Sequence, residues 1–174
     1  NLTVPLAARV LNLPYTIITE ESIAEYARFS SRRDIDTGQS VEWKNVGRNS
    51  AYKLSPYEET LVMDVDYVVQ EDSLLQIFKT DWDYILQRSA RSLNNDYMTP
   101  LMGERSLPYV WATVFAFRKT ERASTFFDLV SRIQANYHYY RELFNIENRT
   151  YRNDFAFAMA DVILNGFKIN NTGI

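Results

Sequence analysis

The sequence predicts an α/β protein in which a mixed central sheet is flanked by helices. Two short, strongly apolar runs, residues 61–69 and 110–117, have the composition of strands buried on both faces of a sheet. Between residues 123 and 144, apolar side chains recur every three or four positions, as in a helix with one buried face. Near the start of the chain, a β-branched run at 15–19 precedes a helical pattern at 20–29, and this alternation is typical of α/β folds.

Size and composition limit the classes of function. The chain has 174 residues, enough for a sizeable core, so we expect residues 1–174 to form a single domain. The formal net charge of −3 argues against a general nucleic-acid partner. The sequence contains no cysteine, no secretory leader pattern and no run near the ~18 apolar residues of a membrane span. We therefore expect a cytoplasmic protein without disulfides, thiolate metal sites or a membrane span.

The first part of the chain is predicted to alternate between regular elements and a polar loop. Residues 2–13 have the periodicity of a helix, 15–19 are predicted as a strand, and 20–29 as a second helix. Residues 30–50 are polar and are predicted as a loop with one short strand at 41–43. An α/β nucleotide site usually has a strand before its first helix. None is evident here, so we expect that the chain is a fragment or that upstream residues are missing from the sequence.

The later elements follow from apolar spacing and from turn residues. A short helix is predicted over residues 70–78, and alternation favours a strand at 82–86. Residues 90–107 are rich in asparagine, proline and glycine and are predicted as a loop. The last helix is predicted at 155–164, with Gly166 just past its end.

Two carboxylates, Asp64 and Asp66, lie near the carboxyl end of the 61–69 run. On an extended backbone, residues two apart point the same way, and neighbouring carboxylates against an apolar wall resist ionising together. A hard divalent cation removes that cost and prefers oxygen ligands. Ligands also bind at the ends of strands in open α/β sheets. We therefore expect Asp64 and Asp66 to hold a metal that in turn holds a phosphate. The alternative is that both are solvated residues at a strand end.

The order of the parts resembles a known family. Residues 55–61 lead directly into Asp64-Val65-Asp66, and this resembles the approach to the Asp-x-Asp motif of GT-A glycosyltransferases, the nucleotide-diphospho-sugar transferase fold. A later strand shapes the sugar and acceptor pocket in that fold, and residues 111–117 are similar in placement. An acidic residue at the start of a late helix is another shared part, and residues 152–156 look like it. The resemblance implies a GT-A-like (Rossmann-like) sheet without its first strand.

The resemblance also implies an activity, the transfer of a sugar from a nucleotide-diphosphate sugar donor to a glycan, protein or small-molecule acceptor. It implies a Mn²⁺ or Mg²⁺ cofactor that neutralises charge on the departing diphosphate. Asp66 would be the direct ligand, and Asp64 would contact metal-bound water, the ribose, or both. Asp154 would be the general base of an inverting reaction or would orient the acceptor in a retaining one. Its alternative role is a helix N-cap.

Several residues near these acids are expected to bind the substrate. They are Val65, Trp111, Thr113, Arg48, Lys53, Arg152 and Asn153. An aromatic face such as that of Trp111 suits a sugar ring, and the basic residues suit a nucleotide or its phosphates. The alternatives are core packing for Trp111 and solvation for the basic side chains. His138, the single histidine, is expected to be structural.

Two other functions are compatible with the same pattern. A nucleotidyltransferase also uses carboxylates for Mg²⁺, but it usually carries a Gly-rich basic loop near its start, and none is evident. A non-catalytic binding or structural protein that retains the fold is the alternative from a different class. Intact Asp64 and Asp66 favour the enzyme, whereas the missing early strand favours the binding protein.

Overall fold

A computed structural model describes residues 2–19, 30–33, 40–91, 94, 101–102, 107–147, 149–168 and 173–174, with the backbone alone at 30–33, 40–46 and 101–102. The elements in chain order are α1 (Thr3–Leu11), β1 (Ser30–Arg33), β2 (Ser40–Trp43), the 3₁₀ helix η1 (Lys44–Ser50), α3 (Ala51–Leu54), β3 (Glu59–Met63), the 3₁₀ helix η2 (Ser73–Lys79), β4 (Tyr84–Leu86), β5 (Leu101–Met102), β6 (Leu107–Pro108), β7 (Val114–Arg118), α4 (Glu121–Ala135), α5 (Tyr137–Leu143) and α6 (Asn153–Leu164). The chain is therefore a mixed α/β protein, as the sequence predicts.

A three-stranded antiparallel sheet with the order β3–β7–β4 forms its centre. β7 lies in the middle because its side chains are apolar on both faces. Phe115 and Phe117 point to one face and Val114 and Ala116 to the other, and all four are buried. An isolated parallel bridge joins Leu86 of β4 to Gly173. The sheet is thus smaller than expected, and its three strands are antiparallel.

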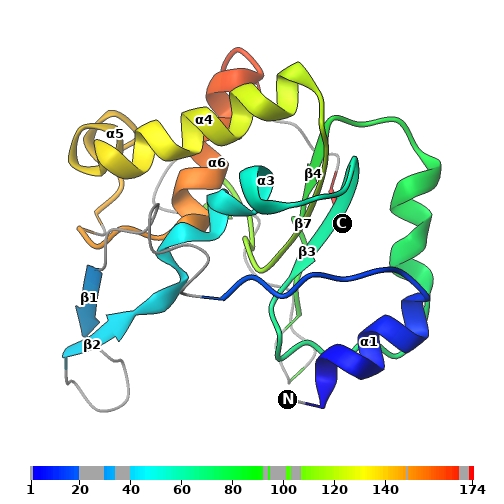
Figure 1. Cartoon of the computed structure of the whole chain (residues 1–174). Helices are drawn as coiled ribbons and strands as arrows, with labels where there is room; N and C mark the ends of the chain where they lie inside the picture. Colours follow the sequence, from blue (N-terminus) through cyan, green and yellow to red (C-terminus); the bar gives the residue numbers. More distant parts are fainter. Residues whose placement is uncertain are drawn as a thin grey trace.

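Helices α4 and α6 cover the face of the sheet that carries the phenylalanines (Figure 1). Phe126 and Phe127 of α4 and Phe157 of α6 are almost fully buried against it. The ring centroid of Phe115 lies 5.1 Å from that of Phe157, and the centroid of Phe117 lies 5.2 Å from that of Phe127. Edge-to-face contacts of this kind add to the burial of large apolar areas. This aromatic core holds the sheet and the two helices together.

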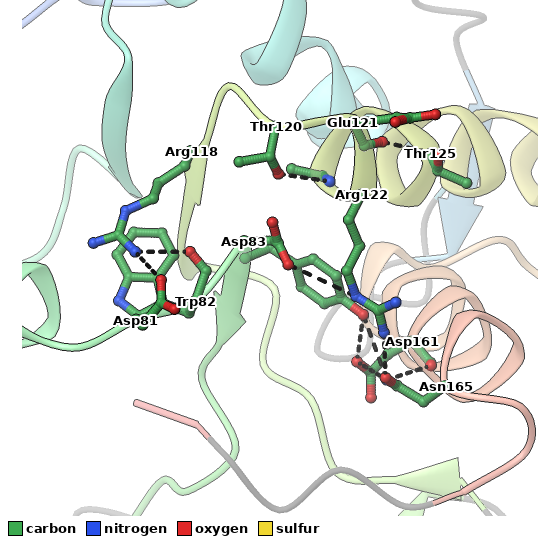
Figure 2. Close-up of polar contacts among 12 residues, drawn as sticks. Asp81, Trp82, Asp83, Arg118, Thr120, Glu121, Arg122, Thr125, Asp161 and Asn165 are labelled. Atoms are coloured by element: carbon green, nitrogen blue, oxygen red, sulfur yellow. Dashed lines mark hydrogen bonds and ion pairs between the residues drawn. The ribbon is translucent and has the colours of Figure 1, made fainter.

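The long helix predicted between residues 123 and 144 is two helices, α4 and α5, divided at Asn136. The start of α4 is capped by Thr120, whose hydroxyl oxygen accepts a hydrogen bond from the Ala123 N–H at 3.2 Å (Figure 2). At the break, the Asn136 side chain donates to the Arg132 carbonyl at 2.9 Å. Asparagine competes in this way with the backbone ladder of a helix, which explains the break.

The apolar run at 61–69 is not one continuous strand. β3 begins earlier, at Glu59, and ends at Met63. The Tyr67 N–H then donates to the Asp64 carbonyl at 3.2 Å, which closes a turn. Val65 and Val68 are exposed, so part of the apolar run does not belong to the core and the prediction of a fully buried strand is wrong.

Other boundaries also differ from the expectation. Residues 13–19 have no regular secondary structure, although 15–19 is predicted as a strand. The helix predicted at 20–29 lies outside the described residues. β7 begins at Val114, and residues 109–113 before it are irregular.

The remaining predicted elements are present with shifted bounds. Within the polar loop at 30–50, β1 pairs with β2, which covers the predicted strand at 41–43. The helix predicted at 70–78 is the 3₁₀ helix η2, and β4 occupies the end of the 82–86 segment. Gly166, with φ of 66°, follows α6 as expected.

A buried polar network joins α6 to the β4 end of the sheet. Asp161 of α6 is fully buried, and its carboxylate accepts hydrogen bonds from Arg88 Nη2 at 2.6 Å and from the Tyr84 hydroxyl at 2.9 Å. Asn165 Nδ2 donates to the same carboxylate at 2.9 Å, and its Oδ1 accepts from Arg122 at 2.7 Å (Figure 2). A charge in the interior requires such partners.

We predict that Asp161→Ala lowers the free energy of unfolding by about 3–5 kcal/mol, because it removes the buried carboxylate that pairs with the largely buried Arg88 guanidinium. Urea unfolding followed by circular dichroism measures the change. Asp128→Ala, which removes an exposed carboxylate on α4, is the matched control and should change stability by less than about 0.5 kcal/mol. Equal losses in the two variants would show that the network does not stabilise the fold.

Candidate functional site

The two acids of the Asp-x-Asp sequence lie on the turn that follows β3, not on an extended strand. The Asp64 N–H donates to the Thr113 carbonyl at 3.2 Å, which attaches the turn to the segment before β7. The Asp64 side chain is 28% exposed, whereas Asp66 lies on the surface. The expectation that the two acids lie on an extended strand is wrong, because the strand ends one residue before Asp64.

Arg48, at the end of η1, is the main partner of Asp64. Its side chain is only 9% exposed, and Nη2 lies 2.5 Å from Asp64 Oδ1. Nη1 of the same guanidinium donates to the Ala112 carbonyl at 2.6 Å. Arg48 thus joins the turn after β3 to the segment before β7 through two charge-assisted hydrogen bonds.

Asp154 contacts the other side of the same peptide segment. It lies in the first turn of α6, and its Oδ1 accepts a hydrogen bond from the Ala112 N–H at 2.9 Å. Its Oδ2 accepts from Arg152 Nη2 at 2.7 Å. The N-cap position of α6 is Arg152, and no side chain caps it, so the capping role considered for Asp154 is wrong. Arg48 and Asp154 instead hold Ala112 from both sides, one at its carbonyl and the other at its N–H.

The carboxylates at this site influence one another. Burial raises the pKa of Asp64, and the negative charges of Asp66 and Asp154 raise it further, while Arg48 opposes the shift. The three acids therefore share one electrostatic neighbourhood with one buried arginine. A second cation would offset the remaining repulsion.

The oxygen donors of Asp64 and Asp66 suit a hard divalent cation. Mg²⁺ is typically bound by one or two carboxylates and keeps several waters or phosphate oxygens as its other ligands. Within the described part of the chain, no cluster of three or more His, Cys, Asp or Glu residues could hold a metal. The donor set thus fits an open site completed by water or substrate, and does not fit a closed structural site.

Trp111 and Thr113, in the segment before β7, contact neighbouring aromatic and polar residues. The Tyr67 hydroxyl lies 2.6 Å from Thr113 Oγ1. The backbone N–H of Trp111 donates to the Gln87 carbonyl at 2.9 Å. The half-buried Trp111 ring stacks on the Tyr109 ring, with centroids 6.1 Å apart. These contacts give Trp111 and Thr113 packing roles beside any contact with substrate.

Tyr109 was not identifiable from the sequence as a site residue. Its hydroxyl is buried and has no hydrogen-bond partner among the described residues. Burial, together with the nearby Asp154 and Tyr67, raises the pKa of Tyr109 to about 12. Its place in an apolar loop sequence suggests packing, and only the fold shows that it lies near Asp154.

Other predicted residues lie elsewhere or have a different partner. Lys53 is exposed in the last turn of α3 and does not line the cavity beside the acids. Asn153 is buried, and its Oδ1 accepts from the Tyr151 hydroxyl at 3.1 Å. The exposed Val65 accepts a hydrogen bond from Thr3 through its backbone carbonyl. His138 is exposed on α5, 3.4 Å from Glu142, away from the acids.

A cavity of about 1290 Å³ opens beside the Asp-x-Asp turn. Its polar end is formed by Arg48, Asp64, Asp66 and Tyr67, and its remaining walls come largely from α1, residues 13–19 and β3. Small-molecule sites in proteins usually measure roughly 300–1,000 Å³. The cavity is therefore larger than a typical small-molecule site.

Comparisons with known proteins add no assignment. No family model matches the chain, and no curated protein or solved structure matches it. Among the helices described, none is long and apolar enough to cross a membrane. The roles of the site residues are therefore argued from their geometry.

We predict that Arg48→Met destabilises the fold by about 2–4 kcal/mol, because a half-buried carboxylate and the Ala112 carbonyl both lose a charged donor. Thermal and urea unfolding measure the loss. Lys53→Met, which removes an exposed positive charge five positions further on, is the control and should be nearly neutral. If Arg48→Met is also neutral, Arg48 does not hold the turn in place.

Proposed function

We propose that this chain is a metal-dependent glycosyltransferase of GT-A type that takes a nucleotide-diphosphate sugar as donor. The observation that carries the proposal is that Arg48, Asp64 and Asp66 line the polar end of a large cavity, with Asp154 close enough to raise the pKa of Asp64. These acids come from segments far apart in the sequence. Their convergence joins the Asp-x-Asp element to the acidic helix start that the family resemblance pairs with it.

In this proposal the exposed Asp66 is the direct ligand of Mn²⁺ or Mg²⁺, and Asp64 supports it from behind. When bound, the cation supplies charge neutralisation for the diphosphate leaving group. Arg48 fixes the position of Asp64 by binding one of its oxygens, and the second oxygen stays available for metal-bound water or a ribose hydroxyl. The buried arginine thus preorganises the acid before the ligand arrives.

Asp154 is the proposed acceptor-side residue. Its Oδ2 is held by Arg152, whose side chain is 41% exposed. Ion pairs at exposed positions contribute little and exchange readily, so a substrate hydroxyl can replace the guanidinium. Asp154 then accepts the proton of the acceptor hydroxyl as that oxygen bonds to the sugar carbon, or orients the hydroxyl without taking its proton. A cytoplasmic location and a glycan, protein or small-molecule acceptor belong to the same proposal.

A non-catalytic binding protein is the second candidate, and one observation favours it. Both oxygens of Asp154 already accept hydrogen bonds, one from Ala112 and one from Arg152. These two contacts are sufficient to explain Asp154 as a residue that fixes the loop before β7, without a role in turnover. The two candidates differ in turnover, not in nucleotide binding.

We predict that UDP, or another nucleoside diphosphate tested beside it, binds only when Mn²⁺ or Mg²⁺ is present. Asp66→Asn should weaken that binding at least tenfold, because an amide is a poorer ligand for a hard cation than a carboxylate. Titration calorimetry with and without EDTA measures both effects. Asp72→Asn, at an exposed acid outside the cavity lining, is the matched control. Binding that ignores both the metal and Asp66 would contradict the proposal.

We predict that Asp154→Asn slows hydrolysis of the nucleotide sugar roughly 10²–10⁴-fold, as expected for the loss of a general base. Donor affinity should stay within about threefold, since the asparagine still accepts from Ala112 through Oδ1. Release of the nucleoside diphosphate measures turnover, and calorimetry measures affinity. Unchanged hydrolysis in a folded variant would assign Asp154 to loop positioning alone.

A further inference from the structure

The outer edge of β3 has no strand beside it among the described residues. The pairing with β7 shows which backbone groups face outward. The Asp64 N–H donates to Thr113 and the Lys119 N–H donates to Glu58, so alternate residues 58, 60, 62 and 64 bond to β7. The N–H and C=O groups of Glu59, Leu61 and Met63 therefore point away from β7.

These outward groups border the cavity described above. All residues of β3, from Glu59 to Met63, line it, although neighbours in a strand point to opposite faces of a sheet. The cavity therefore runs along the edge of the strand and does not lie over one face. At about 3.3 Å per residue, the five residues give an edge of roughly 17 Å.

A second part of the cavity wall is a largely apolar segment without regular secondary structure. Residues 13–19 line the cavity one after another, and they form no strand pairing in the structure. Tyr15 and Ile17, which have strand-type sequence, are 56% and 52% exposed. Helix α1 adds apolar residues at helical spacing, including Val4, Ala7 and Leu11. Figure 1 shows α1 and the segment that follows it passing beside β3.

The physical character of this slot distinguishes between occupants. A lipid chain satisfies the apolar walls but leaves the outward N–H and C=O groups of β3 without partners. A nucleotide satisfies polar groups but not a long apolar wall. An extended polypeptide satisfies both, because its backbone continues the ladder and its side chains alternate between the two apolar sides. Strands without partners are also a common place for such addition.

We propose that the slot between β3 and residues 13–19 binds one extended, apolar polypeptide strand of a partner protein. The strand pairs with the outward groups of Glu59, Leu61 and Met63. Its binding completes the sheet on the side of the Asp-x-Asp turn. The backbone of the partner strand makes the hydrogen bonds, so no particular sequence is required. The apolar walls favour apolar, β-branched side chains in that strand.

The test uses the full chain and a peptide of six alternating valine and threonine residues flanked by lysines, with blocked ends. Hydrogen exchange of the individual β3 amides is measured by NMR as peptide is added. Exchange of the Leu61 and Met63 amides should slow at least tenfold, while the Val62 amide, already bonded to β7, should change little. The same peptide with prolines at two central positions should protect neither amide, because proline has no N–H and disrupts a strand.

Two variants of one residue test the backbone requirement. Leu61→Pro removes the outward N–H without touching the β7 ladder, a change that edge strands tolerate, and should weaken peptide binding at least tenfold in fluorescence anisotropy. Leu61→Ala keeps the N–H and should bind within a few-fold of the original chain. Circular dichroism and thermal unfolding confirm that both variants are folded.

Several results would overturn the proposal. These are the absence of amide protection by the peptide, equal binding to Leu61→Pro and the original chain, or protection by oleate in place of the peptide. Protection that rises with chain concentration alone would assign the edge to a second copy of the chain. None of these readouts involves nucleotide, metal or turnover, so they fail or succeed independently of the proposed transferase activity.

Discussion

The arrangement of the site depends on the backbone of one residue, Ala112, being held by two side chains of opposite charge. Arg48 donates to its carbonyl and Asp154 accepts from its N–H. Arg48 comes from η1, before β3, and Asp154 from the start of α6, after α4 and α5. Because each of these side chains also has a charged partner, Asp64 or Arg152, the two clamps connect four of the charged groups proposed for function. A change at Ala112 is therefore transmitted to the acids on either side of it.

The clamp requires a rigid support, and the aromatic core supplies it. Residues 109–113 lead directly into β7, the central strand, whose phenylalanines are packed by α4 and α6. Since α6 both covers that strand and carries Asp154, one helix fixes the core and the acid together. Close packing in a protein interior leaves little room for adjustment, so the position of Asp154 relative to β7 is determined by the same contacts that stabilise the fold.

Sequence patterns predict the parts of this protein that obey local rules. The strand within the 110–117 run, the helices near 123–144 and 155–164 and the position of Gly166 follow from periodicity and turn chemistry, and these elements are present. The boundary of β3 was not predictable, because Val65 and Val68 extend the apolar pattern into a turn that is set by a hydrogen bond to Thr113, far away in the sequence. The 15–19 run shows the converse: its strand composition is clear, yet a strand requires a neighbour, and the described chain provides none.

The same distinction applies to the site. Asp64, Asp66, Asp154 and Arg48 were identifiable by residue type and order, but their contacts depend on tertiary structure. Arg48 was expected either near phosphates or solvated; it is buried against Asp64 and lines the cavity, so the solvated alternative is wrong. Asp154 was a candidate cap and instead reaches across to another segment. Tyr109 carries no sequence signal, since a tyrosine in an apolar loop is ordinarily a packing residue and its unpartnered hydroxyl becomes apparent only in the fold.

The electrostatics of the site also make the stability of the fold depend on pH. The pKa of Asp64 is raised by burial and by two neighbouring acids, so its ionised form costs folding free energy that its protonated form does not. The protonated form of Asp64 therefore contributes stability below the unfolded-state pKa, and this stability is lost as the pH rises through the higher folded-state pKa. A protein selected for stability alone would remove the crowding by replacing one acid. Asp66 and Asp154 both lie close enough to affect Asp64, and a ligand that brings positive charge would relieve this repulsion when it binds.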